Sequence, residues 1–346
     1  MMGILNINHP EIIKFIRSKL EPNKFTNFNF SVLVNDDFMK KIDTNEKIDL
    51  VFNGEIWNRV GAKDLWDLIA FCAWNGGDPG LLFYEALNRD NITGEKIYTT
   101  NPCGEVGLTI NEVCTLGSIN LSKFVKNNHI DFKKLEQYIV LGTRTLLNMN
   151  AIANYPHKDI AKKMKKYNRI GLGVMGFAEM LIRLGVYYDS EDALKIIDEI
   201  GSRMKEITDK IAKKSVAKRT IAPTGTISRV ANTTSGIEPP FAREYISNLT
   251  IGKIKEGKEI FYSKYCRTAH EIAPEWHLKI QARWQKYIDN AVSKTVNLPN
   301  SATVEDIKKI YRLAYEWGCK GITVFRDGCR EGVLHKVKCS DGSCYL

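Results

Sequence analysis

Hydrophobic and polar positions alternate along the chain in two spacings, one helical and one extended. Apolar residues recur every three or four positions in HPEIIKFIRSKL (9–20), which predicts a helix, whereas FNFSVLV (28–34) is a β-rich run that predicts a strand. The helical spacing returns near 62–73, 80–89 and 131–149. Strands separated by helices indicate an α/β architecture with parallel pairing.

The same alternation continues through the second half of the chain. A long amphipathic helix is expected over 191–215, with the Asp189 side chain able to cap its first turn. RTIAP (219–223) predicts a strand that runs into a turn at Pro-Thr-Gly. There is no internal repeat and no low-complexity linker, and the length suits two ordinary domains or one large one.

The last periodic segments lie close to the C-terminal end. TVEDIKKIYRLAYEWG (303–318) predicts a helix with Thr303 as its cap and Gly318 as its stop. GITVF (321–325) is an apolar run that predicts a buried strand. Residues 331–346 lose all periodicity, which predicts a flexible tail.

Composition places the chain among soluble globular proteins. It has 346 residues, of which 44% are hydrophobic and 26% charged. The opening MMGILNINHPEIIKF has none of the features of a secretory signal, and the most apolar stretch, LWDLIAFCAW, is short and carries Asp67. These features predict a cytoplasmic protein with no membrane partner.

The net charge of +10 is spread over helical lysine faces such as 158–168 and 209–219. Solvated helix faces explain this pattern better than an anionic partner, which stays open as the second interpretation.

Eight cysteines in a reducing compartment are expected to be free unless they do chemistry or hold metal. No CxxC and no paired Cys/His spacing of the zinc-finger kind occurs, so no metal site is predicted. Cys72, inside an apolar helical stretch, is interpreted as a core residue.

One cysteine lies in a segment that favours chemistry. In NPCGE (101–105), Pro102 and Gly104 flank Cys103 and predict a tight loop that exposes the sulfur. Asn101 and Glu105, each two residues away, can point to the same side of an extended loop. An amide, a thiol and a carboxylate facing one ligand suit acid–base work beside a sulfur centre. The alternative is a turn with an incidental cysteine.

A second candidate is the turn in IAPTGTISRVANTTSGIEPPFA (221–242). A strand, then Pro-Thr-Gly-Thr, then a helix start would offer backbone amides to a phosphate, although the spacing is not that of a P-loop. An ordinary capped turn is the alternative.

Gly171, Gly173 and Gly176 in RIGLGVMG fit GxGxxG, but a basic helical segment precedes them. We therefore interpret them as positions of close helix packing and not as a dinucleotide site. Cys339 and Cys344, in the tail, are two exposed thiols able to exchange with a disulfide elsewhere, unless the tail is unimportant.

Taken together, these segments resemble the large catalytic subunit of ribonucleotide reductase. The resemblance rests on NPCGE (101–105), CTLGSINL (114–121), RIGLGVMGFAEML (169–181), APTGTIS (222–228), SGIEPPFA (235–242) and GCKGITVFRDG (318–328). It implies an α/β fold, namely a portion of a ten-stranded α/β barrel with a central finger loop, incomplete at its N-terminal side. Residues 1–330 would form the C-terminal part of the catalytic barrel, and 331–346 would form a redox tail.

The resemblance also assigns roles in the reduction of ribonucleotides to 2′-deoxyribonucleotides. Cys103, sheltered inside the barrel, would be the thiyl radical that removes the 3′-hydrogen of the ribose. Glu105 would take the 3′-OH proton, and Asn101 would orient the ribose hydroxyls. Cys114 would be one of two thiols that reduce the substrate. Cys339 would act with Cys344 to re-reduce the resulting disulfide.

The substrate phosphates would lie on the backbone amides and hydroxyls of one turn, made of Thr224, Gly225, Thr226 and Ile227. The implied partners are the ribonucleotide and a thioredoxin- or glutaredoxin-like reductant, and a homo-oligomer stays open.

The class of reductase is indicated by what the motifs contain. The strand region 323–328 has no Tyr-Tyr pair, which the oxygen-dependent class uses, and Glu105 is present, which the anaerobic class usually lacks. The sequences GITVFRDG and APTGTIS resemble the corresponding segments of the adenosylcobalamin-dependent class. Adenosylcobalamin is therefore the expected radical source.

The first redox cysteine of the family has no counterpart here, so the chain is expected to be the C-terminal piece of a split enzyme that needs an N-terminal reductase polypeptide. The rival interpretations are a non-catalytic remnant and a basic nucleotide- or nucleic-acid-binding module.

Overall fold

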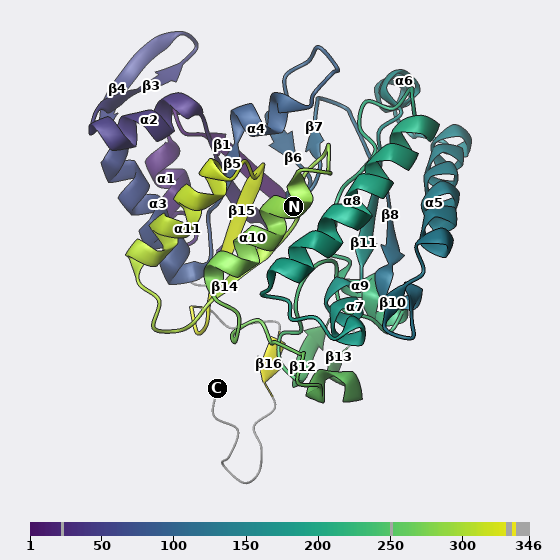
Figure 1. The fold of residues 1–346 in the computed structure, drawn as a ribbon. Coiled ribbons are helices and arrows are strands. Elements are labelled where there is room, and N and C mark those ends of the chain that lie inside the picture. The colour runs from purple at the N-terminus through teal and green to yellow at the C-terminus, as the bar shows by residue number, and fades with distance from the viewer. Residues whose placement is uncertain (22–23, 250–251, 330–333, 337–346) are drawn as a thin grey trace.

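The computed structural model describes residues 1–21, 24–249, 252–329 and 334–336 (Figure 1). Its main sheet has five strands in the order β1-β2-β5-β15-β14. These strands are β1 (Met2–Asn6), β2 (Asn29–Val34), β5 (Gly80–Phe83), β15 (Gly321–Arg326) and β14 (Thr295–Leu298). The first three are parallel, β15 is antiparallel to β5, and β14 is parallel to β15. The sheet therefore places strands from residues 2–83 next to strands from residues 295–326.

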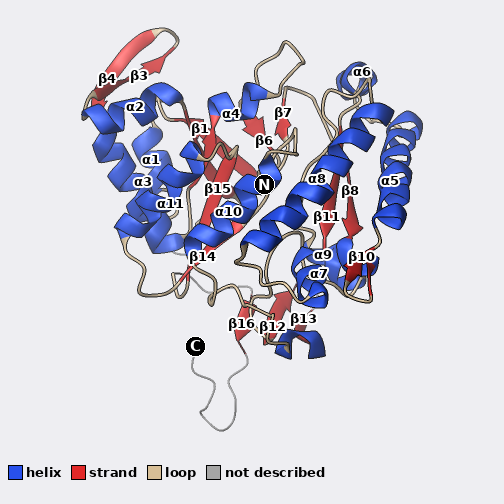
Figure 2. Ribbon diagram, in the orientation of Figure 1, coloured by secondary structure: helices blue, strands red, loops and turns tan. Residues whose placement is uncertain are grey.

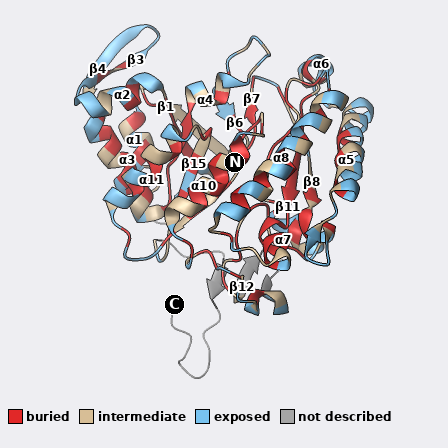
Figure 3. Ribbon diagram, viewed as in Figure 1, coloured by how far each residue is buried: buried red, intermediate tan, exposed pale blue. Residues whose placement is uncertain are grey.

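Helices cover this sheet on its outer side (Figure 2). They are α1 (Ile12–Arg17), α2 (Asp36–Thr44), α3 (Ala62–Gly76) and α11 (Val304–Glu316). Their apolar faces meet the strands in one core that includes Phe38, Trp66 and Tyr311. Figure 3 shows the burial that results, with exposed residues on the outer helix faces. In the sheet, β5 is wholly buried and β2 is buried except for its first residue.

A second group of elements is built around β8 (Thr115–Asn120) and β11 (Ile170–Met175), which pair in parallel. Its helices are α5 (Phe132–Ile152), α7 (Phe177–Leu184), α8 (Glu191–Ile211) and α10 (Pro274–Gln285). They enclose a separate core that contains Ile197 and Trp284.

Single bridges join the two groups of strands. Leu172 of β11 pairs in parallel with Arg219, and Ile221 pairs in parallel with Val292, which leads into β14. The strands thus run in one series from β8 to β1. Over the described residues, β8 and β1 each pair with one neighbour only, so the series is open and not a closed barrel. The α/β class is confirmed, and the ten-stranded closure stays a prediction.

The remaining elements are short or peripheral. They are the hairpins β3 (Lys47–Phe52)/β4 (Glu55–Gly61), β6 (Thr99–Thr100)/β7 (Gly107–Leu108) and β9 (Val125–Lys126)/β10 (His129–Ile130), the helices α4 (Tyr84–Arg89), α6 (Lys158–Tyr167) and α9 (Gly225–Val230), the 3₁₀ turns Leu121–Phe124 and Glu259–Tyr262, and the strands β12 (Glu244–Leu249), β13 (Gly252–Gly257) and β16 (Leu334–Lys336). No helix within the described ranges is long and apolar enough to cross a membrane.

Several local predictions are confirmed, and they are the ones with explicit end signals. Thr303 accepts a hydrogen bond from the Asp306 amide and forms a capping box at the start of α11. Gly318, just beyond this helix, adopts the left-handed conformation that favours glycine (φ 72°).

Other local predictions are wrong. The first part of the helix expected over 80–89 is instead the fully buried strand β5. A four-residue apolar run is compatible with a helix or a strand, and pairing with neighbouring strands decides between them. Ser190, and not Asp189, caps α8, since the Ser190 Oγ accepts a hydrogen bond of 3.2 Å from the Ala193 amide. That helix ends at Ile211, short of the expected 215.

The glycines of RIGLGVMG lie mainly in a strand, and the prediction of helix packing is wrong. A Cβ on Gly173 of β11 would lie 2.0 Å from the Thr220 backbone oxygen. These glycines therefore allow the 219–221 segment to approach β11. In the tail, Leu334–Lys336 pair with β12 as β16, and the rest of 331–346 lies outside the described residues.

Candidate functional site

The NPCGE segment forms the turn of the hairpin between β6 and β7. The Asn101 amide donates to the Val106 oxygen (3.2 Å), and the Asn101 Oδ1 accepts from the Val106 amide (3.0 Å). Gly104 has a φ of 79°, a conformation that favours glycine, and its amide donates to the Asn101 oxygen (3.0 Å). The tight loop predicted around Cys103 is confirmed.

The hairpin is fastened between the two groups of strands. The Glu105 backbone oxygen accepts hydrogen bonds from the Thr220 Oγ1 (2.6 Å) and the Ala291 amide (2.8 Å). On the other side, the Asn29 side chain at the start of β2 donates to the Pro102 oxygen (2.7 Å). Elements far apart in the sequence therefore set the position of the loop.

Cys103 lies at the tip of this loop and is exposed. The prediction from Pro102 and Gly104 that the loop exposes the sulfur is confirmed, whereas the shelter implied by the resemblance is wrong for the described residues. The hairpin still removes water from one side of the sulfur. This desolvation raises the pKa of the Cys103 thiol, and the Glu105 carboxylate raises it further, so the sulfur retains its proton at neutral pH.

Glu105, two residues on, is buried, with 2% of its surface exposed. Burial raises the pKa of its carboxyl, while hydrogen bonds from its own backbone amide and from the Asn101 side chain oppose that rise. The Glu105 Oε2 has no hydrogen-bond partner among the described residues. A buried acceptor without a partner is costly, and it marks a position where a donor from a ligand would be stabilised.

Cys114 lies immediately before β8 and is partly buried. Burial raises the pKa of its thiol strongly, the Arg169 guanidinium lowers it, and the Glu112, Asp289 and Glu105 carboxylates raise it. The Glu105 carboxylate thus raises the pKa of both thiols, that of Cys103 and that of Cys114.

A buried ion pair whose two charges act on the Cys114 thiol was not predicted. The Arg169 Nε lies 2.6 Å from the Glu112 Oε1, and both side chains are almost fully buried. Thr109 donates to the other Glu112 oxygen from its amide and its hydroxyl, and the Arg169 Nη1 donates to Asn290. The signal available in the sequence was a single arginine directly before the apolar strand of RIGLGVMG.

The second candidate segment forms the turn before α9. Thr224 has a φ of 56°, and its Oγ1 accepts a hydrogen bond from the Gly236 amide (2.7 Å). The next three residues are exposed, and they are Gly225, Thr226 and Ile227. Their amides belong to the first turn of the helix, which has no earlier carbonyl to accept them. The turn therefore presents donors to solvent at the end of the 219–221 segment.

The other cysteines lie elsewhere. Cys72 and Cys319 are buried in the first core, which confirms the prediction for Cys72, and Cys266 is buried in a small apolar cluster. The candidates Cys339 and Cys344 lie outside the described residues. In the part of the chain that the structure describes, no group of three or more His, Cys, Asp or Glu residues is arranged to hold a metal.

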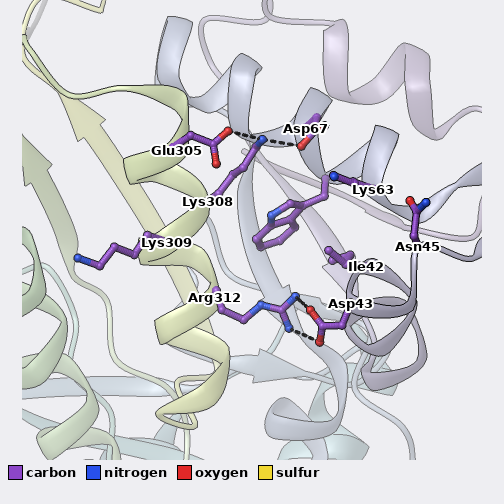
Figure 4. Close-up of a pocket in the computed structure, with 10 residues that line it drawn as sticks. Ile42, Asp43, Asn45, Lys63, Asp67, Glu305, Lys308, Lys309 and Arg312 are labelled. Atoms are coloured by element: carbon purple, nitrogen blue, oxygen red, sulfur yellow. Dashed lines mark hydrogen bonds and ion pairs between the residues drawn. The ribbon is translucent and has the colours of Figure 1, made fainter.

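A hollow of about 440 Å³ between α2, α3 and α11 is separate from these segments (Figure 4). Its charged groups are largely paired already, since Arg312 holds Asp43 and Lys308 holds Asp67 and Glu305. None of its lining residues belongs to the 101–106 turn or the 224–227 turn.

Comparison with known proteins agrees with the motifs. Residues 1–218 and 246–325 match the family described as "Ribonucleotide reductase, barrel domain". The chain is 38% identical to a vitamin B12-dependent ribonucleoside-diphosphate reductase of Thermoplasma acidophilum, with 94% of this chain and 51% of the relative aligned. It is 36% identical to a protein of the same name from Mycobacterium tuberculosis (96% and 57%) and 24% identical to a vitamin B12-dependent ribonucleotide reductase of Streptomyces coelicolor (96% and 48%).

The chain spans about half the length of the curated relatives it matches. The family match nevertheless covers most of its residues and includes the hairpin, β8 and β11. The chain belongs to the ribonucleotide reductase barrel-domain family.

Proposed function

We propose that this chain supplies the finger loop and one redox thiol of a ribonucleotide reductase that converts ribonucleotides to 2′-deoxyribonucleotides. The observation that carries the proposal is the 101–106 turn, in which Asn101, Cys103 and Glu105 are presented together by a hairpin fastened to both groups of strands. The relatives are named ribonucleoside-diphosphate reductases, so a nucleoside diphosphate is the substrate to test first.

Cys103 is the residue proposed to become a thiyl radical and remove the 3′-hydrogen. The raised pKa of its thiol supports this role, because a hydrogen atom is taken from S–H and not from a thiolate. Glu105 is proposed as the base for the 3′-OH proton. Its unpartnered Oε2 supports that role, since a substrate hydroxyl would give this oxygen a donor. Asn101 is proposed to orient the same hydroxyls.

Cys114 is proposed as one of two thiols that reduce the 2′ position. In that step the C2′–O bond breaks and the 2′-oxygen leaves as water. Two thiols supply two electrons and two protons and become a disulfide, which Cys339 and Cys344 would reduce in turn with the help of a thioredoxin- or glutaredoxin-like protein. Cys72, Cys266 and Cys319 are buried in apolar clusters that do not include Cys114, and Cys329 lies beyond the end of β15, so none of them is proposed as the second thiol.

The second thiol is therefore proposed to come from an N-terminal reductase polypeptide, as in a split enzyme. The exposed Cys103 supports this, as do the edges of β1 and β8, which meet no further strand within the described ranges. Added strands would shelter the sulfur from water, as radical chemistry needs. The 224–227 turn is proposed to bind the substrate phosphates through its exposed amides.

Adenosylcobalamin is proposed as the cofactor, by analogy with the names of the relatives. When bound, it supplies an organic radical able to take a hydrogen atom from a thiol. The chain fits such a source, because Cys103 is accessible at the loop tip and its thiol is protonated.

The test combines the full chain with the part of the Thermoplasma acidophilum relative that it does not cover, together with cytidine diphosphate, adenosylcobalamin and a dithiol. We expect deoxycytidine diphosphate, its complete loss with Cys103→Ser, and its retention with Cys329→Ser, a matched change at a partly buried cysteine beyond the end of β15. Product that survives Cys103→Ser would overturn the catalytic role. If this chain alone gave as much product as the mixture of the two polypeptides, the proposal of a split enzyme would be overturned. Salt-sensitive nucleic-acid binding without any nucleotide reduction would favour the binding-module alternative.

A further inference from the structure

Lys294, at the entry to β14, is a buried cation with no part in the chemistry proposed above. Its side chain has 0% exposure, and its ammonium is paired with the Glu238 carboxylate. The same nitrogen lies 3.0 Å from the His277 Nδ1 and 3.2 Å from the Thr295 oxygen. A buried ammonium is strongly unfavourable unless it is paired and hydrogen-bonded, so this arrangement is a specific one.

Glu238 belongs to SGIEPPFA (235–242), a motif that has no role in the chemistry proposed above. Its second oxygen, Oε1, accepts a hydrogen bond of 2.8 Å from the Thr295 amide. His277 completes the cluster, because its Nε2 lies 2.8 Å from the Ala269 oxygen and so carries the proton, which leaves Nδ1 to accept from Lys294. The cluster fastens the 235–238 loop to β14.

The other side of this loop contacts the 224–227 turn. The Gly236 amide donates to the Thr224 Oγ1 (2.7 Å), and the hydroxyls of Ser235 and Ser228 lie 2.9 Å apart. A Cβ on Gly236 would lie 2.9 Å from the Ala222 oxygen, so the two segments are in direct contact. The position of the loop therefore sets the position of the turn.

Thr224 needs such support. It is a β-branched residue with a φ of 56°, and this conformation is unfavourable for a side chain branched at Cβ. Such a conformation persists where the surroundings hold it. The 235–238 loop supplies the Gly236 amide that holds the Thr224 hydroxyl, and the loop is in turn held by Lys294.

We propose that Lys294 and Glu238 are positioning residues for the phosphate-binding turn, acting through the 235–238 loop. They do not touch the substrate. Their ion pair holds the loop, the loop holds Thr224 in its left-handed conformation, and the amides of 225–227 are then directed at an anionic group. The inference rests on the proposed phosphate role of this turn and adds a residue pair that controls it.

The test is binding of inorganic pyrophosphate to the full chain, measured by isothermal titration calorimetry. Lys294→Met leaves the Glu238 carboxylate without its cation, and we expect the affinity for pyrophosphate to fall by about tenfold or more. Lys308→Met is the matched control, since Lys308 is also an ion-paired lysine but lies on α11 next to Asp67. The affinity of Lys308→Met for pyrophosphate should equal that of the wild type.

A double variant, Lys294→Met with Glu238→Leu, separates positioning from simple stability. It removes both buried charges, so the chain should recover most of the stability lost in Lys294→Met. We expect pyrophosphate affinity to stay low, because neither side chain fastens the loop to β14. Recovery of affinity along with stability would show a merely structural role and overturn the inference.

The wild-type measurement separates failure of the positioning role from failure of the proposed phosphate role of the 224–227 turn. If the wild type binds pyrophosphate and Lys294→Met binds it equally well, the positioning role fails while the phosphate site stands. If the wild type does not bind pyrophosphate, the phosphate role of the turn fails, and the positioning role fails with it.

Discussion

Thr220 donates a hydrogen bond of 2.6 Å from its Oγ1 to the backbone oxygen of Glu105. The two residues are 115 positions apart, and the contact is buried. It joins the hairpin that carries Cys103 to the strand segment that leads into the 224–227 turn. The two candidate segments are thus parts of one structure.

Thr220→Val keeps the shape of this side chain and removes its hydroxyl. The Ala291 amide still donates to Glu105, so we expect a loss of about 1–2 kcal/mol in the free energy of unfolding. Urea denaturation measures the loss, and hydrogen exchange should show faster opening of amides 101–107. Thr145→Val, at an exposed position of α5, is the control. Equal exchange in both variants would contradict the anchoring role.

Gly173→Ala tests why the second glycine of RIGLGVMG is required. The new Cβ would lie 2.0 Å from the Thr220 backbone oxygen, and this backbone cannot move without breaking its pairing with β11. We expect a loss of about 3 kcal/mol in unfolding free energy or failure to fold. Gly76→Ala, where no atom lies within 4 Å of the added Cβ, should be neutral or slightly stabilising. A tolerated Gly173→Ala would refute the close approach.

How far the fold was predictable depends on how local the determining interactions are. Thr303 marks the start of α11 and Gly318 lies just beyond its end. Both signals depend on residues nearby in the sequence, and both were predicted. The strand at 80–83 is a strand because β2 and β15 flank it, and these neighbours lie far away in the sequence. The same limit applies to RIGLGVMG, whose glycines face a segment that follows a long helix.

The site divides in the same way. The residue types and spacing of NPCGE predicted a thiol, a carboxylate and an amide on one tight loop, and the loop is confirmed. The exposure of the Cys103 sulfur was also predicted from Pro102 and Gly104, whereas the shelter that the resemblance implied is not found, because shelter depends on which strands surround the loop. The ion pair of Arg169 with Glu112 joins residues 57 positions apart, and no local sequence pattern predicts it.

Arg169→Met should be among the most destabilising changes near Cys114. It leaves the Glu112 carboxylate buried without its cation, and breaking a buried pair in this way costs about 3–5 kcal/mol. The midpoint of urea denaturation measures the effect. Lys195→Met, which removes a pair on the exposed face of α8, should leave the midpoint nearly unchanged. Similar midpoints for both variants would show that the Glu112 carboxyl becomes neutral or hydrated at little cost.

Glu105→Gln should make Cys103 more reactive. The Glu105 carboxylate contributes to the raised pKa of the Cys103 thiol, so removing its charge lowers that pKa and increases the thiolate fraction at about pH 8. Alkylation by iodoacetamide, followed at this peptide by mass spectrometry, should be faster at that pH and should reach half its maximal rate at a lower pH. The buried thiols of Cys72 and Cys319 serve as internal controls and should not react in the native chain. An unchanged pH profile at Cys103 would mean that the carboxyl is already neutral.

His277 should make the chain less stable as the pH falls below neutrality. Burial lowers the pKa of this imidazole well below its usual range, the Lys294 ammonium lowers it further, and the hydrogen bond to the Ala269 oxygen opposes the shift only in part. In the unfolded chain the same imidazole binds a proton near pH 6.5. Below that pH the unfolded state holds one more proton than the folded state, so stability falls with decreasing pH by up to about 1.4 kcal/mol per pH unit. His277→Gln should remove this part of the slope between about pH 5 and pH 6.5 in urea denaturation, whereas His157→Gln, at an exposed position, should retain it. If His277→Gln and the wild type lose stability at the same rate over this range, His277 is protonated in the folded chain. Its Nδ1 then cannot accept a hydrogen bond from Lys294, and that assignment is wrong.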